Sequence, residues 1–208
     1  MSHLRNFAII AAALAATTLA GCQRNPLVVK RSVCPAIAIP TYTGDTTLFT
    51  GAGNDAANID VVAAITNVRD TCVDGPVTLA ADVTYDIQAT RKATVGARTV
   101  TLPVFATLVQ GGNLVVSKQV GGVAITFADG QARATGRGGA RATVARAAAS
   151  LPEAIQIKVN RKRKAGDLDA AVDPLADPEV RAALRAASFE LLIGFQLNEA
   201  SLAYNVAK

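Results

Sequence analysis

Histidine is nearly absent from this chain, and its absence excludes the most common forms of enzyme chemistry. The only histidine is His3, so residues 4–208 contain none. Ser-His-Asp and Cys-His catalysis, histidine general bases and histidine metal ligands all need a residue that this part of the chain lacks. Tryptophan is absent and aromatic residues make up 4% of the sequence. Stacking surfaces for sugars or single-stranded nucleic acid are therefore scarce.

Carboxylates are left as the groups for acid–base or metal chemistry. Asp82 and Asp86 are candidates for a catalytic pair, which in an enzyme acting on cell-wall sugar lies about 5 to 9.5 Å apart in a cleft. Their even spacing within an alternating segment indicates solvent exposure instead. Asp167-Leu168-Asp169 is similar to the acidic pair of some glycosyl transfer enzymes, but no nucleotide-binding βαβ pattern accompanies it. The surrounding acidic stretch also lacks the features of a calcium loop, so we expect no metal and no cofactor.

Basic residues are concentrated in residues 131–164. This segment has nine Lys and Arg residues and one acid, whereas residues 165–180 have five acids and no base. Its end is a candidate cluster for binding an anionic lipid, a cell-wall polymer or an acidic partner, and consists of Arg161, Lys162, Arg163 and Lys164. The alternative is a solvated face that the following acids neutralise, and three glycines at residues 136–139 suggest a flexible turn within it. Without Arg5 the chain has 20 bases and 16 acids, too small an excess to indicate nucleic-acid binding.

The N-terminal segment has the organisation of a cleaved signal. Arg5 precedes an uncharged, mostly apolar run of 13 residues, Phe7–Leu19, which is too short to cross a bilayer as a helix. The motif that follows, Leu19-Ala20-Gly21-Cys22, resembles the lipobox of bacterial lipoproteins. The resemblance implies a signal peptide over residues 1–21 and lipidation of Cys22. An ordinary secretory peptide is the alternative.

The residues after the lipobox imply where the protein is sorted. Gln23, and not aspartate, follows Cys22, which in lipoproteins of two-membrane bacteria implies transfer to the outer membrane. The domain would face the periplasm, and the inner membrane and the cell surface remain alternatives. Residues 22–33 are expected to form a tether between the lipid and the domain, because they are short, polar and basic and contain Pro26.

Two cysteines, Cys34 and Cys72, remain once Cys22 is lipidated. In a compartment that permits disulfides we expect them to form a bridge. In the chain-entropy model a loop of this length contributes roughly 4 kcal/mol of stability. Two buried free thiols are the alternative, and a metal site is less favoured because no histidine is available to join them.

Apolar and polar residues alternate with a period of two over several segments. From Val77 to Ala89 every odd position is apolar, as expected of a strand with one face on a core. The pattern recurs in Val100–Leu108, Ile155–Val159 and Phe189–Leu197. In the segment that starts at Ile59 the apolar positions shift after residue 65, which predicts a bulge near Thr66-Asn67.

Turn residues separate these strands and predict consecutive antiparallel pairs. The turns are Asp74-Gly75-Pro76, Gly111-Gly112-Asn113 and Asp129-Gly130. Pro103 cannot donate to a ladder and predicts an edge strand or a bulge, and Gly121-Gly122 predicts a second bulge. Seven or eight strands with such turns predict an all-β fold over residues 34–208, an antiparallel β-sandwich that is loosely immunoglobulin-like.

The charged segment 161–187 interrupts the strand pattern. Asp177 is a good N-cap, Pro178 suits the first helical position, and Glu179 suits the positive end of the helix dipole. Since Val180, Leu184 and Ala187 then share a face, we expect one helix of about ten residues that packs across the sandwich.

The C-terminal run, GFQLNEASLAYN over residues 194–205, predicts a last strand and then a short helical turn. Asn198 would cap this turn, and Leu202 and Tyr204 would pack it onto the open end of the sandwich. This run, together with Cys34-Pro35, resembles small lipoproteins of unknown function from proteobacterial envelopes. The resemblance implies no activity.

Two functional classes follow from these observations. The first, which we favour, is a lipid-anchored periplasmic envelope protein that acts as a non-catalytic interaction or scaffolding module. Its partners would be the membrane, through the lipid, and an envelope protein or an anionic cell-wall or lipid surface. The alternative is a carboxylate-dependent enzyme that acts on cell-wall polysaccharide.

Overall fold

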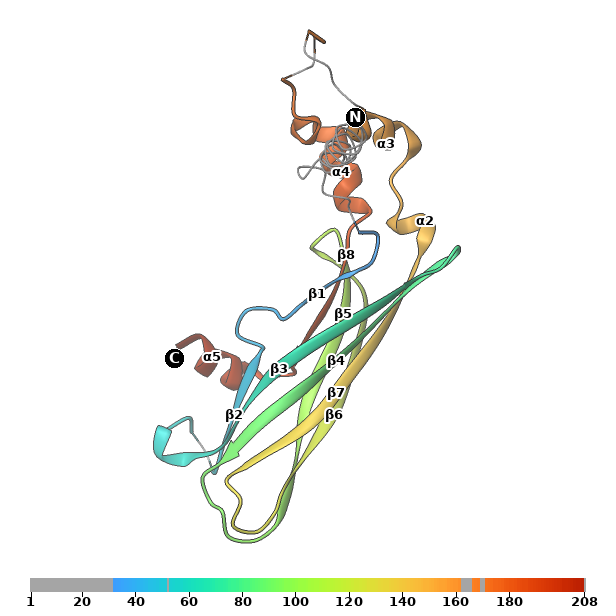
Figure 1. Cartoon of the computed structure of the whole chain (residues 1–208). Coiled ribbons are helices and arrows are strands. Elements are labelled where there is room, and N and C mark those ends of the chain that lie inside the picture. The colour runs from blue at the N-terminus through green and yellow to red at the C-terminus, as the bar shows by residue number, and fades with distance from the viewer. Residues whose placement is uncertain (1–31, 52, 162–165, 169–170, 208) are drawn as a thin grey trace, which may run out of the picture. The chain divides into compact units, whose positions relative to one another are not determined.

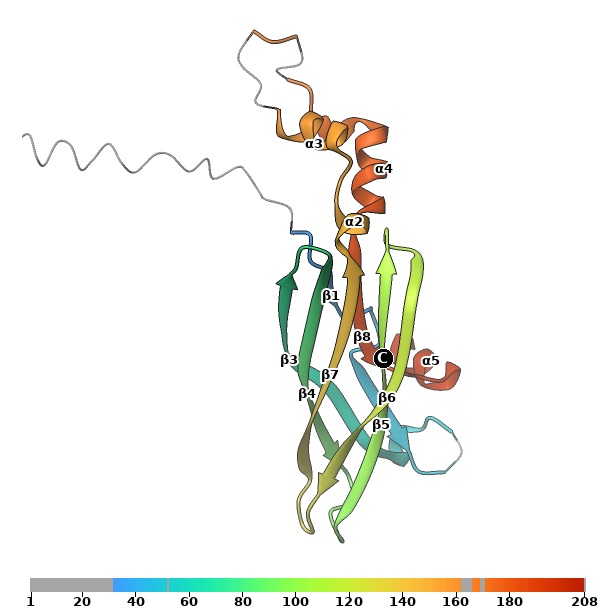
Figure 2. The same cartoon turned by 90° about the vertical axis from the view of Figure 1, so that its right-hand side faces the viewer.

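Two four-stranded sheets form a β-sandwich, as the sequence predicts (Figures 1 and 2). The computed structural model describes residues 32–51, 53–161, 166–168 and 171–207. The first sheet has the order β1-β8-β5-β6, with bounds Ala36–Ala38, Phe189–Phe195, Arg98–Gln110 and Leu114–Phe127. The second has the order β2-β3-β4-β7, with bounds Asp45–Phe49, Ile59–Asp74, Thr78–Arg91 and Arg133–Ala145. Neighbouring strands are antiparallel except β1 and β8, which are parallel.

The core lies between the sheets and consists of the alternating apolar residues. On β4 the odd positions from Leu79 to Ala89 are buried, as predicted. They face buried residues of the first sheet, including Leu102, Ile125, Ile193 and Phe195. Burying such side chains contributes roughly 25 cal/mol per Å² of apolar surface, which makes this core the main source of stability.

The predicted bulge on β3 is present. The pairing of β3 with β4 shifts between Thr66 and Arg69, and Asn67 has a positive φ of 52°. Asparagine tolerates this left-handed conformation better than most residues. The three predicted turns join β3 to β4, β5 to β6 and β6 to β7. The last turn closes no hairpin, because β6 and β7 belong to different sheets.

Pro103 lies in an interior strand, so the prediction of an edge strand was wrong. β5 pairs with β6 on one side and with β8 on the other, but the ladder with β8 covers only Val104–Gln110. Pro103 falls immediately outside that ladder, and its carbonyl accepts the N–H of Gln196 at 2.9 Å. The missing N–H therefore faces a position where the ladder ends.

The glycines of β6 and β7 do not form a bulge or a flexible turn, contrary to expectation. Gly121 and Gly122 pair in unbroken register with β5, and a Cβ on Gly122 would lie 2.7 Å from Cγ2 of Thr101. Residues 136–139 are regular strand within β7. A Cβ on Gly136 would lie 2.9 Å from the carbonyl oxygen of Ala124, and one on Gly138 would overlap the Tyr85 ring. These glycines permit close packing.

Ile155–Val159 is helical, and its prediction as a strand was wrong. The segment belongs to helix α3, Glu153–Asn160, which follows the short helix α2, Arg146–Ala149. Pro152 precedes α3, and Glu153 lies at the positive end of its dipole, so local signals favour a helix start. Ile155 is buried whereas Ile157 is 62% exposed, because residues two apart lie on opposite sides of a helix. The helical insertion thus begins at residue 146, earlier than predicted.

The predicted helix after residue 177 is α4, Pro178–Ala186. The Asp177 carboxylate accepts the N–H of Glu179 at 2.8 Å, as expected of an N-cap. Val180 is fully buried. The helix packs against α3 and the 3₁₀ helix η3, Pro174–Ala176. It does not cross the sandwich but lies beyond the ends of the strands (Figure 2).

The C-terminal helix is α5, Glu199–Ala207, and Asn198 caps it by accepting the N–H of Ser201 at 2.7 Å. Tyr204 packs edge-to-face on Phe49 of β2, with ring centroids 5.0 Å apart. Leu202 is 42% exposed, so the prediction that it holds the helix to the sandwich was wrong. The fixed point is Asn205, which is buried and donates to the main-chain carbonyls of residues 42 and 45.

Arg91 is a buried charge at the end of β4. It is 3% exposed, and its guanidinium donates to four main-chain carbonyls, those of Thr94, Gly96, Ala128 and Gln131, at 2.7 to 2.8 Å. These carbonyls belong to the β4–β5 and β6–β7 connections. The guanidinium also lies over the Phe127 ring, 5.2 Å from its centroid. One side chain thus joins the two connections at this end of the sandwich.

Cys34 and Cys72 form the predicted disulfide. Their Cα atoms are 6.3 Å apart. Cys34 lies just before β1 in the first sheet, and Cys72 lies on β3 in the second sheet, so the bridge links the two sheets covalently. In the part of the chain that the structure describes, no helix is long and apolar enough to cross a membrane.

Candidate functional site

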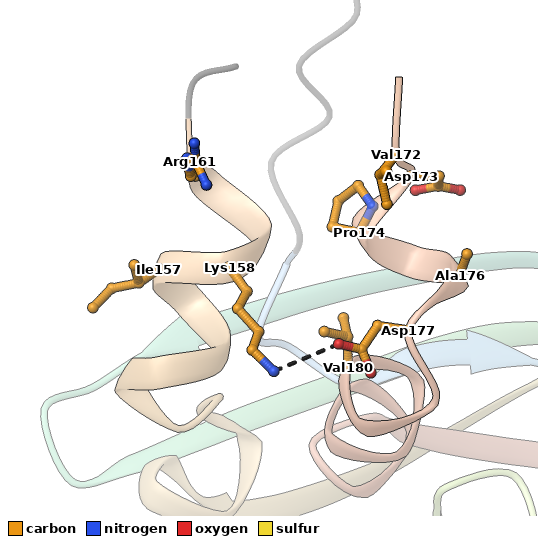
Figure 3. Close-up of a pocket in the computed structure, with 9 residues that line it drawn as sticks. All are labelled: Ile157, Lys158, Arg161, Val172, Asp173, Pro174, Ala176, Asp177 and Val180. Atoms are coloured by element: carbon orange, nitrogen blue, oxygen red, sulfur yellow. Dashed lines mark hydrogen bonds and ion pairs between the residues drawn. The ribbon is translucent and has the colours of Figure 1, made fainter. Parts of the chain in front are cut away.

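A groove of about 560 Å³ lies between α3, η3 and α4 (Figure 3). We call it the α3–α4 groove. Its size falls within the range of small-ligand pockets. The residues that line it are mostly apolar, with two acids and two bases among them: Ile157, Lys158, Arg161, Val172, Asp173, Pro174, Ala176, Asp177 and Val180.

Helix caps position two sides of the groove. Asp173 caps η3 by accepting the N–H of Leu175 at 2.8 Å, and Asp177 caps α4. Both aspartates thus hold main-chain N–H groups that a helix start leaves without a partner. Val180, in the first turn of α4, is buried, whereas Ile157 of α3 and Val172 are exposed.

Lys158 of α3 is paired with Asp177, the N-cap of α4, and with Glu179 in its first turn. Nζ of Lys158 lies 3.5 Å from Oδ2 of Asp177 and closer still to Oε2 of Glu179; Figure 3 shows Lys158 and Asp177 pointing toward each other. The N–H of Glu179 and the ammonium of Lys158 hold the pKa of Asp177 below its ordinary value. Glu179 in turn raises the pKa of Lys158. Asp177 is therefore ionised at neutral pH and cannot serve as a general acid.

Arg161 is the one member of the predicted anion-binding cluster that lies within the described residues. Its guanidinium lies 3.6 Å from the Asp167 carboxylate, so part of its charge is balanced by the acidic stretch that follows. Lys162, Arg163 and Lys164 lie outside the described residues, as does Cys22. The same holds for Asp169, so the Asp167–Asp169 pair is not described.

Three of the other basic residues of segment 131–164 lie on β7, and two of these contact acids of the neighbouring strand β4. Arg141 makes a two-point contact with Asp82 at 2.6 and 3.1 Å, and Arg137 contacts Asp86 at 3.3 Å. Arg146 contacts an acid at the end of β3, at 2.7 Å. Such exposed pairs contribute little to stability, but they neutralise the surface.

The candidate catalytic pair, Asp82 and Asp86, lies on the outer face of β4, and each aspartate contacts an arginine of β7. Hydrogen bonds from Asn67 and Arg137 lower the pKa of Asp86, whereas the acid of a glycosidase pair needs a raised pKa. Neither aspartate lines the α3–α4 groove. Within the described ranges, no group of three or more His, Cys, Asp or Glu side chains could hold a metal ion.

Sequence reasoning missed the groove because it assigned one wall, α3, to a strand. The available signal was Pro152-Glu153, which marks the start of a helix.

Comparisons with known proteins give no relative from which a function could be inferred. No family model matches the sequence, and no curated protein and no solved structure is significantly similar to it. Function must therefore be argued from the site.

Proposed function

We propose that this protein is a lipid-anchored envelope protein with a non-catalytic interaction domain, and that an envelope partner protein places an apolar segment in the α3–α4 groove. The groove itself carries the proposal. Ile157 and Val172 are 62% and 57% exposed beside it, whereas Lys158 and Asp177 pair with each other. An apolar surface whose charges are already balanced favours an apolar partner over an anionic polymer.

The same contacts argue against the alternative of a carboxylate-dependent enzyme. Asp177 caps a helix and has a lowered pKa, and Asp82 and Asp86 are paired on an outer face. A hydrolase of this kind needs one carboxyl group that holds its proton near neutral pH. Asp86 and Asp177 have lowered pKa values instead, and Asp82 makes a two-point contact with Arg141.

The envelope location is proposed from the sequence. Leu19-Ala20-Gly21-Cys22 supports cleavage before Cys22 and lipidation at its thiol, with the outer membrane as the destination. The disulfide supports a compartment where thiols are oxidised, since such bridges are rare in the cytosol.

Site-specific photo-crosslinking in intact cells tests this function. A photoreactive amino acid at position 157 of the full-length chain should form an adduct with a partner protein, which mass spectrometry then identifies. The matched control is position 95, since Val95 is an even more exposed apolar residue, at 93%, on the β4–β5 connection. Ala176→Phe, at an exposed position in the groove wall, should fill the groove and abolish the adduct. Equal adducts from positions 157 and 95, or an adduct that survives Ala176→Phe, would contradict the proposal.

A further inference from the structure

One edge of the first sheet is uncovered over nine consecutive residues. β6 is the last strand of its sheet, and every residue from Leu114 to Gly122 is exposed. Only from Val123 onward does the alternation of buried residues begin. There β7 lies against β6, because Gly136 approaches Val123, Ala124 and Ile125. From their shared turn the two strands separate toward the opposite end of the sandwich (Figure 2).

The register shows which main-chain groups face this open edge. The carbonyl of Pro103 accepts the N–H of Gln196, so the polar groups of Pro103 point toward β8 and away from β6. In antiparallel pairing, its partner Gly122 must then point away from β5. By alternation Val120 and Lys118 do the same. Their N–H and C=O groups line an edge beyond which the described part of the sheet has no further strand.

The side chains of this edge do not protect it. Leu114, Val115, Val116 and Val120 are 50 to 59% exposed, and Lys118 is the one charged residue of β6. Its ammonium lies over the Phe105 ring, 5.5 Å from the centroid, and thus on the face of the sheet, not across its edge. Proteins usually block such an edge with charges, prolines or a covering segment, because an open apolar edge pairs with other strands.

We propose that two copies of this chain pair through the exposed part of β6, antiparallel about a two-fold axis at Gln119. A second copy fits because the strand has a single charge, which offers no attraction for a partner of opposite charge, and because the same strand can satisfy its own open groups in an isologous contact. The β1-β8-β5-β6 sheets of the two copies then become one continuous sheet.

The two-fold axis follows from the register. Outward-facing residues must meet outward-facing residues, so an axis at Lys118 would set lysine against lysine, which destabilises a strand pair. An axis at Val120 would set Val116 opposite Ala124, where β7 blocks the edge, and would leave only residues 118–122 to pair. An axis at Gln119 sets Lys118 opposite Val120 and Gln119 opposite itself, and lets the uncovered residues 116–122 pair.

Disulfide trapping tests the register in the full-length chain. Gln119 would form a non-hydrogen-bonded pair with its copy, with Cα atoms about 4.5 Å apart, within the range that a disulfide can bridge. Gln119→Cys in isolated membranes should therefore give a covalent dimer on mild oxidation. The controls are the parent chain and Thr126→Cys, an exposed position on the same strand beside β7.

A second variant tests the interface without a new thiol. Val120→Lys sets a charge against Lys118 of the other copy and should weaken the dimer at least tenfold, as measured by light scattering of the purified full-length protein in detergent. Circular dichroism checks that the exposed substitution leaves the fold intact. A parent chain that stays monomeric, Gln119→Cys trapping no greater than that of Thr126→Cys, or a dimer unaffected by Val120→Lys would each overturn the proposal.

Discussion

Replacing Arg91 tests whether one buried side chain holds the turn end of the sandwich together. Arg91→Met keeps an aliphatic chain of similar length over Phe127 but removes four hydrogen bonds to main-chain carbonyls. Arg91 is 3% exposed, and its guanidinium contacts both the β4–β5 and the β6–β7 connections. The side chain of methionine has no hydrogen-bond donor, so these four carbonyls lose their partner.

The size of the effect follows from two opposing contributions. A hydrogen bond from a charged donor contributes about 1.5 to 3 kcal/mol, but burying the guanidinium costs several kcal/mol in lost hydration. We expect Arg91→Met to lower the free energy of unfolding by about 3 to 5 kcal/mol, near the top of the range for single substitutions. For a domain of this size the melting temperature should fall by roughly 10 °C. Arg91→Lys retains the charge but has three donors on one atom, and should give an intermediate loss.

Thermal and urea unfolding, followed by circular dichroism with the disulfide intact, measure the effect. Arg137→Met is the matched control, because Arg137 is 79% exposed and contacts a single acid; its melting temperature should stay within about 2 °C of the parent. Hydrogen exchange at Gly96, whose N–H donates to the Asp129 carboxylate at 2.6 Å, reports on the connections directly. An Arg91→Met variant as stable as Arg137→Met would refute the reasoning.

Three further predictions concern the cysteines and one helix cap. Cys22→Ser should prevent incorporation of labelled fatty acid and leave an unprocessed or soluble protein; a variant that stays with membranes after salt washing, beside a parent that takes up no label, would rule out the anchor. Alkylation and intact mass with and without reduction should show Cys34 and Cys72 joined, and replacing both with serine should cost roughly 4 kcal/mol of stability for the 38-residue separation. Asp177→Ala should lower the melting temperature at pH 7. Because the pKa of Asp177 is lowered from 3.8 in the folded state, its contribution is complete above that value and is lost as the pH falls below it, so the parent and the variant should melt alike at the acid end of a pH series.

Local patterns were sufficient for much of the sandwich. The alternation on β4 and β8 fixes one face of each strand, so the core residues follow from the sequence. The bulge at Thr66-Asn67 is visible because the apolar positions change phase there. The start of α4 at Asp177-Pro178 is equally local, since a cap and a first-turn proline act within one turn of helix.

The prediction of residues 155 to 159 as a strand overlooked the local signal Pro152-Glu153, because three alternating residues suit a strand face as well as a helix.

Features that depend on distant contacts were not predictable. The glycines of β7 appear flexible until Tyr85 of β4 is placed against them. Arg91 continues the odd, inward phase of β4 after Ala89, so its burial had a sequence signal. The four carbonyls that accept its hydrogen bonds come from two separate connections, and no sequence pattern predicted them.

The disulfide determines how the domain would respond to a pull on its N-terminus. β1 is a three-residue strand, paired in parallel with β8, and strands drawn from one end yield one hydrogen bond at a time. Because Cys34 precedes β1 and is bonded to Cys72, tension is diverted into β3 before it reaches β1. β3 has 16 residues and is hydrogen-bonded to β2 and β4 on its two sides. Oxidised protein should therefore withstand a larger force than reduced protein, because the pull enters β3 at Cys72 and bypasses β1, which lies within the loop that the disulfide closes.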